Sequence, residues 1–172
     1  MDLLKLTEKS MAMNPDSWMR HANPISVYSR FTVLPLLTLA IYARTWLGSV
    51  AWLFVALVLL WTWLNPRLFS APKTTDNWAS MATFGERVYL NRAKESLIPK
   101  HHLLVCRILL ILQLVAVPVW GYALIDLRFD WAIFTTAWLM VTKAWFVDRM
   151  VWIYMDVKDH NEQYAAWLKT SS

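Results

Sequence analysis

Four long apolar stretches constrain the fold of this chain more than any other feature of its sequence. They occupy residues 25–46, 48–65, 102–125 and 131–154. Each is close to the length of about 20 residues that a helix needs to cross a hydrocarbon core of about 30 Å. Only short turns separate the first stretch from the second and the third from the fourth. The pattern predicts an all-α integral membrane protein, a four-helix bundle built from two antiparallel hairpins.

Composition supports a membrane protein of one domain, residues 1–172. Hydrophobic residues make up 58% of the chain and charged residues 17%, whereas soluble domains carry about 25% charged residues. The 12 tryptophans are typical of a chain that meets a membrane interface. The single cysteine, Cys106, excludes an internal disulfide. The basic residues do not cluster on one polar helix, so we expect no nucleic-acid partner.

The polar segments outside the stretches contain signals for further helices. Asparagine followed by proline favours a helix start, and this pair occurs at residues 14–15, 23–24 and 65–66. We therefore expect a short helix from about Pro15 and the first span from about Pro24. In the long polar loop, residues 66–101, Thr75-Asp76-Asn77 predicts the cap of a helix from Trp78 to about Arg92. The first 20 residues mix charged and apolar side chains without a cleavage site, which predicts an amphipathic segment.

The distribution of lysine and arginine predicts the orientation. The two short turns hold only Arg44 and Arg128, whereas the N-terminal segment, the long loop and the C-terminal end hold nearly all the other basic residues. Basic connections stay in the cytoplasm by the positive-inside rule. We therefore expect a multi-pass protein of the cell inner membrane, with both termini and the 66–101 loop on the cytoplasmic side.

The fourth stretch carries a tryptophan stripe, which we define as Trp131, Trp138, Trp145 and Trp152. The seven-residue spacing places these side chains on one helix face. Asp148, Arg149 and Asp156 lie on or beside that face, and charges within a span usually point toward protein. We expect the stripe to point into the bundle, either as a packing seam or as the wall of a substrate groove. Lys143 lies on another face and should snorkel or contact another helix.

Polar residues on the cytoplasmic side form the candidate site. A carboxylate at membrane depth has a raised pKa and can act as an acid or a base. The candidate catalytic residues are Asp148, Glu86, Arg149, Asp76 and Asn77.

Imidazole and carboxylate side chains on the same side make a metal site a second expectation. Such groups bind iron, manganese or zinc, and the candidate ligands are His21, His101, His102, Glu86 and Asp148. Two adjacent histidines on a helix do not face one ion unless the segment next to Pro99 is unwound. The alternative is that the His101-His102 pair simply lies among lipid headgroups.

Several short motifs resemble those of a family of small four-span membrane proteins known only as a domain of unknown function. The resemblance extends over about residues 18–156 and implies no activity. The similar stretches are His21-Ala22-Asn23-Pro24, Trp63-Leu64-Asn65-Pro66-Arg67, Thr75-Asp76-Asn77-Trp78-Ala79-Ser80, Gly85-Glu86-Arg87-Val88, Asn91-Arg92 and Asp148-Arg149-Met150-Val151-Trp152.

Three functions fit these observations. The first is a membrane-embedded enzyme, with or without a transition metal, that acts on a lipophilic small molecule near the cytoplasmic interface. The second is a non-catalytic subunit or scaffold of a larger membrane complex, in which the tryptophan stripe packs against a partner or a pigment. The third is a small transporter, which would have to be a homo-oligomer because four spans rarely enclose a pathway. The lipid bilayer is a partner in all three.

Overall fold

The computed structural model describes residues 15–92 and 97–170, and within these ranges it contains helices and no strand. The prediction of an all-α fold is confirmed. Part of the predicted amphipathic segment, residues 1–14, lies outside the described residues. The helices are α2 (Pro15–His21), α3 (Pro24–Ser29), η1 (Arg30–Thr32), α4 (Val33–Tyr42), α5 (Arg44–Leu47), η2 (Gly48–Val50), α6 (Ala51–Leu68), α7 (Trp78–Asn91), α8 (Lys100–Ile125), α9 (Phe129–Val157), η3 (Lys158–His160) and α10 (Glu162–Ala165).

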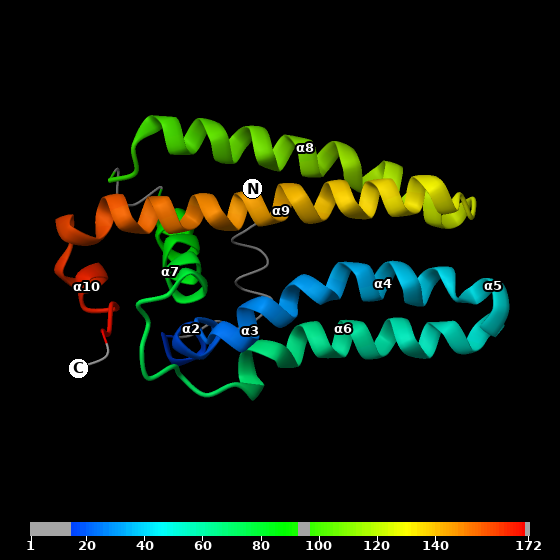
Figure 1. Ribbon diagram of the computed structural model, residues 1–172, viewed down its shortest axis with the longest axis horizontal. Helices are drawn as coiled ribbons and strands as arrows, with labels where there is room; N and C mark the ends of the chain where they lie inside the picture. Colours follow the sequence, from blue (N-terminus) through cyan, green and yellow to red (C-terminus); the bar gives the residue numbers. More distant parts are fainter. Residues whose placement is uncertain (1–14, 93–96, 171–172) are drawn as a thin grey trace.

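The long helices form two hairpins, as the short turns predicted. Figure 1 shows α4 and α6 running antiparallel, with the turn beyond α5, and α8 running antiparallel to α9. The first turn uses Gly48, whose φ of 56° favours glycine. The two hairpins meet where α4 packs against α9 and α8, and α6 packs on the other side of α4. At this junction Thr38 and Thr136 are hydrogen-bonded at 3.0 Å.

Two helical stretches, Pro24–Leu68 and Lys100–Ile125, are long and apolar enough to cross a membrane. The first stretch has 45 residues and turns back at Gly48, so it contains both legs of the first hairpin. In the most apolar part of each stretch only 6% and 17% of the residues are buried, so most of these side chains lie outside the core of the molecule. The fourth predicted span lies in α9, which contains Lys143, Asp148 and Arg149 and is not one of these two stretches.

The core lies at the end of the molecule where α7 crosses α9. The Asn77 side chain caps α7 by accepting a hydrogen bond of 3.0 Å from the Ser80 N–H, which confirms the predicted cap and helix. Gly85 permits a very close crossing, because a Cβ there would lie 1.8 Å from the Met150 carbonyl oxygen. The long loop therefore provides the central helix of the core. The buried cluster around this crossing includes Phe84, Val88, Tyr89, Cys106, Leu109, Phe146, Met150, Ile153 and Tyr154.

The Asn-Pro pairs occupy different positions relative to the helices. Asn23 caps α3, since its side chain accepts a hydrogen bond of 3.0 Å from the Ile25 N–H. The pair at residues 65–66 does not start a helix but lies inside α6. There the buried Asn65 amide accepts a hydrogen bond from the Ser26 hydroxyl at 2.7 Å and donates one to the Ser29 hydroxyl at 2.8 Å. Asn65 thus joins α6 to α3. Asn14 lies outside the described residues.

The expectation that the tryptophan stripe points into the bundle is wrong. Its four side chains are 38–54% exposed on the outer surface of α9. The buried face of α9 is formed by smaller or aliphatic residues next to the tryptophans, including Thr135, Leu139, Thr142 and Met150. This face of α9 packs against α8 and α7.

Candidate functional site

A cavity of about 230 Å³ lies where the start of the first hairpin, α7 and the α8–α9 hairpin meet. Its walls are mainly apolar, but they include two basic side chains, a carboxylate and an amide. An apolar cavity with a few converging polar groups is the usual form of a small-molecule site. The lining residues are Val27, Arg30, Phe31, Ala82, Thr83, Glu86, Leu110, Gln113, Lys143, Phe146, Val147 and Met150.

Arg30 is fixed in the cavity wall by several hydrogen bonds. Its Nε donates to the Ser26 carbonyl oxygen at 3.1 Å, and its Nη2 donates to the His21 carbonyl oxygen at 3.2 Å. Its Nη1 also contacts the His21 Nε2. The guanidinium therefore has a defined position, which reduces the entropy lost when a ligand binds beside it.

Lys143 reaches the same wall from α9. Its Nζ donates to the Arg30 carbonyl oxygen at 3.1 Å and lies 5.1 Å from the centre of the Phe31 ring. Of the two outcomes expected for this side chain, the structure shows contact with another helical segment. The ammonium and the guanidinium thus lie on one side of the cavity.

Glu86 supplies the carboxylate, from the third turn of α7. It interacts electrostatically with both Arg30 and Lys143. Charges behind apolar walls interact more strongly than charges in water and must be compensated. The cavity therefore contains two cations and one anion, and the attraction of Glu86 for both cations offsets part of the repulsion between Arg30 and Lys143.

His21 lies directly behind Arg30 and is 5% exposed. Burial, and secondarily the positive charge of Arg30, hold the pKa of this imidazole well below its ordinary value of 6.5. The Nε2 is engaged by Arg30, and the buried Nδ1 has no hydrogen-bond partner among the described residues. A neutral ring in this position supports the guanidinium, and it would have to leave Arg30 to bind a metal through Nε2.

Three other predicted site residues lie outside the cavity lining. The Asp148 carboxylate accepts hydrogen bonds from the indole N–H groups of Trp78 at 2.9 Å and Trp152 at 3.3 Å. Asp76 is exposed beside the α7 cap, and Asn77 is that cap. Asp148 therefore links α9 to the start of α7, whereas Asn77 stabilises the first turn of α7 itself.

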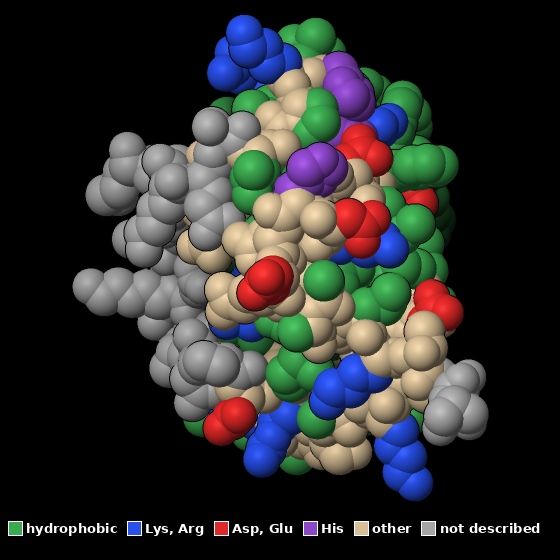
Figure 2. Space-filling view, turned by 90° about the vertical axis from the view of Figure 1, so that its left-hand side faces the viewer, with side chains coloured by type: hydrophobic (Ala, Val, Ile, Leu, Met, Phe, Trp, Pro, Cys, Tyr) green, Lys and Arg blue, Asp and Glu red, His purple; other side chains and the backbone are tan. Residues whose placement is uncertain are grey.

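A second polar cluster, formed by His101, His102 and Asp156, lies at the start of α8. One ligand atom from each residue lies within 4.8 Å of the others, the only such group of three among the described residues. His102 Nε2 lies 2.8 Å from an Asp156 oxygen, and the Arg149 Nη1 lies 3.4 Å from His102 Nδ1. Figure 2 shows histidine, acidic and basic side chains gathered on this end face.

The geometry of this cluster is unfavourable for a metal ion. Both nitrogens of His102 already face a partner, and Arg149 places a positive charge beside the ring. A cation bound there would have to displace one of these contacts and overcome that charge. His21, Glu86 and Asp148, the other predicted ligands, do not belong to the group.

Comparison with known proteins identifies a family but no activity. A sequence model described as "Family of unknown function (DUF6653)" matches residues 5–172. No curated protein and no solved structure matches the chain.

Proposed function

Since the chain belongs to the DUF6653 family, whose function is unknown, we propose a function from its own residues. We propose that it is a membrane-embedded enzyme that performs acid–base chemistry on a lipophilic small molecule near the cytoplasmic interface. The observation behind this proposal is the placement of Glu86 beside Arg30 and Lys143 in a mainly apolar cavity.

The proposal includes a membrane embedding with four spans, two from each hairpin. The outer faces of the hairpins expose many large apolar side chains, such as Leu39, Leu57, Leu114 and Val141. An apolar surface this extensive is rare on a soluble monomer. At 1.5 Å per residue, α8 with 26 residues is about 39 Å long, which is enough for a bilayer. The positive-inside rule then favours the α7 end as the cytoplasmic end.

The groups in the cavity have complementary roles in the proposed reaction. Glu86 accepts a proton from the substrate and returns it, as a general base and acid. Lys143 and Arg30 stabilise negative charge that develops on the substrate, an effect that is strong where water is excluded. The apolar walls, including Phe31 and Phe146, favour a lipophilic molecule. This chemistry requires only groups that line the cavity.

Substitution of Glu86 tests the proposal. The small molecules that copurify with the protein in mild detergent would be identified by mass spectrometry, and delipidated protein would be incubated with the same extract. For Glu86→Gln we expect the ligand to remain bound and product formation to fall by about 100-fold or more, the usual effect of losing a general base. Asp148→Asn, outside the cavity, is the matched control and should retain turnover. Equal turnover in wild type and Glu86→Gln would refute the proposal.

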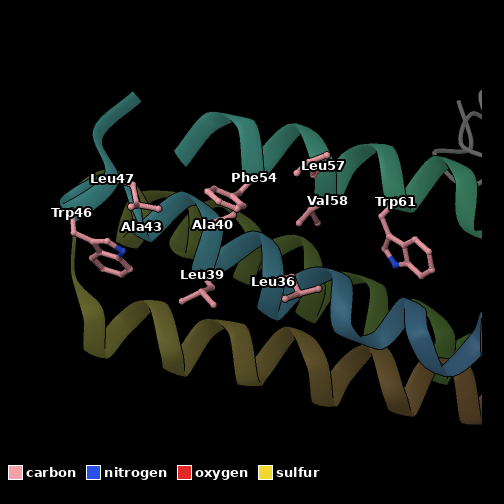
Figure 3. Close-up of a pocket in the computed structure, with 10 residues that line it drawn as sticks. All are labelled: Leu36, Leu39, Ala40, Ala43, Trp46, Leu47, Phe54, Leu57, Val58 and Trp61. Atoms are coloured by element: carbon pink, nitrogen blue, oxygen red, sulfur yellow. The ribbon is translucent and has the colours of Figure 1, made fainter. Parts of the chain in front are cut away.

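An apolar groove favours a second candidate function, that of a non-catalytic subunit in a membrane complex. The groove lies between α4 and α6, has a volume of about 420 Å³ and is lined almost only by apolar side chains. Figure 3 shows Leu36 and Leu39 of α4 beside this groove, with Phe54 and Trp61 of α6 along its other edge. A stable protein partner that copurifies from native membranes without a bound small molecule would favour this candidate.

A further inference from the structure

A groove of about 550 Å³ runs along the surface between the end of α7 and the first half of α8. It combines basic and apolar side chains, and none of the described residues that line it is acidic. Leu110 also lines the internal cavity, so the groove and the cavity adjoin each other at this residue. The groove is lined by Tyr89, Arg92, Leu103, Arg107, Leu110, Ile111 and Leu114.

The two arginines form the basic part of the groove. The Arg92 guanidinium lies 4.2 Å from the centre of the Tyr89 ring, and its Nη1 donates to the Tyr89 carbonyl oxygen at 2.8 Å. These contacts hold it at the end of α7. Arg107 is exposed on α8. Two guanidinium groups on one groove match a phosphate, whose oxygens accept bidentate hydrogen bonds.

The apolar part of the groove continues along α8 away from the arginines. Ile111 and Leu114 are exposed and lie about one and two turns beyond Arg107. At 1.5 Å per residue, Leu114 is about 10 Å farther along the helix than Arg107. In the proposed embedding this direction leads from the cytoplasmic headgroup level toward the centre of the bilayer. The groove is therefore basic at the headgroup level and apolar toward the centre of the bilayer, which matches the headgroup and the acyl chains of a phospholipid.

We propose that this groove binds an anionic phospholipid, with the phosphate between Arg92 and Arg107 and an acyl chain along Leu110, Ile111 and Leu114. Basic pockets beside membrane helices on the cytoplasmic side are suited to anionic lipid headgroups. The inference depends on the membrane embedding proposed above but not on the enzymatic activity.

Native mass spectrometry of the full chain in detergent micelles tests this site. The probes are phosphatidylglycerol, phosphatidylcholine with the same acyl chains, and glycerol phosphate as the headgroup alone. The wild type should bind phosphatidylglycerol more tightly than phosphatidylcholine and should not retain glycerol phosphate. Arg107→Gln should weaken the binding of phosphatidylglycerol about fivefold, the effect of about 1 kcal/mol for a basic residue at a membrane surface. Arg92→Gln should have a similar effect.

The control is Arg128→Gln, which removes an exposed arginine from the turn at the opposite end of the molecule. Equal affinity in Arg107→Gln and wild type, or an equal loss in Arg128→Gln, would overturn the proposal. Retention of glycerol phosphate as strong as that of the lipid would indicate a site for free phosphate instead. Arg107 is exposed, so we expect Arg107→Gln to fold. This variant tests the proposal even if Arg92→Gln unfolds the protein. Turnover that depends on Glu86 is measured separately, so the two proposals can fail independently.

Discussion

At the scale of single residues, we expect the burial of His21, and secondarily its contact with Arg30, to make stability depend on pH. Above the ordinary histidine pKa of 6.5, the imidazole is neutral in both the folded and the unfolded chain. Below 6.5, the unfolded chain binds a proton that the buried ring, with its lowered pKa, does not. The free energy of unfolding should therefore decrease as the pH falls below 6.5, with a limiting slope of about 1.4 kcal/mol per pH unit.

His21→Gln should remove this pH dependence while its side-chain oxygen still accepts a hydrogen bond from Arg30. Thermal unfolding in detergent between pH 7.5 and 5.5 measures the slope. His160→Gln, at an exposed site on the same end of the molecule, should leave it unchanged. The same slope in His21→Gln and wild type would show that other groups cause the pH dependence.

Only part of the candidate site could be predicted from the sequence at this scale. Glu86 was expected to be a reactive carboxylate, and it lines the cavity. Arg30 and Lys143 were not among the expected site residues, although each is a charge within an apolar stretch, which is a known signal for a functional residue. The partners of these charges come from three distant segments of the chain, and periodicity within one helix does not reveal such contacts. Asp148 was selected for its position in the span, but two indole groups satisfy its carboxylate.

At the scale of elements, the crossing of α7 over α9 depends on Gly85. Alanine at this position would place its Cβ against the backbone of Met150, and backbone moves less readily than a side chain. We expect Gly85→Ala to lower the free energy of unfolding by about 2 kcal/mol or more, as overpacking in a core does.

Gly121→Ala is the matched control, since α8 has open space around Gly121. This substitution should be neutral or should stabilise the helix by up to about 1 kcal/mol. Melting curves of the two variants under identical conditions compare them directly. Similar melting temperatures for Gly85→Ala and Gly121→Ala would show that the close crossing is not required.

The presence of the helices and the positions of the turns were predictable from the sequence, because they depend on signals from neighbouring residues. The caps at Asn23 and Asn77 and the turn at Gly48 all follow from neighbouring residues. The central position of α7 was not predictable, because its close crossing joins Gly85 to Met150, which lies far away in the sequence. The outward direction of the tryptophan stripe was also missed, because the charges beside it suggested a buried face. Indole rings can supply hydrogen bonds to such a charge from the surface.

At the scale of the whole molecule, the proposed embedding places the α7 end in the cytoplasm and the two hairpin turns outside. Single-cysteine labelling with a membrane-impermeant reagent, in a Cys106→Ser background, tests this arrangement. Asp76→Cys should react only after the membrane is permeabilised, whereas Asp130→Cys, near the second turn, should react in intact cells. Both positions are exposed. The reverse pattern would contradict the orientation, and labelling of both sites in a soluble fraction would contradict the embedding.

The central claim is that the cavity beside Glu86 holds one lipophilic molecule within the membrane-embedded protein. The most direct measurement is photo-crosslinking in cells, with a photoreactive amino acid at Gln113 in the cavity wall or at the exposed Val141 on α9. At Gln113 we predict that mass spectrometry finds one dominant small-molecule adduct, and at Val141 a mixture of bulk membrane lipids. The same lipid mixture at both positions, or no adduct at Gln113, would contradict the account.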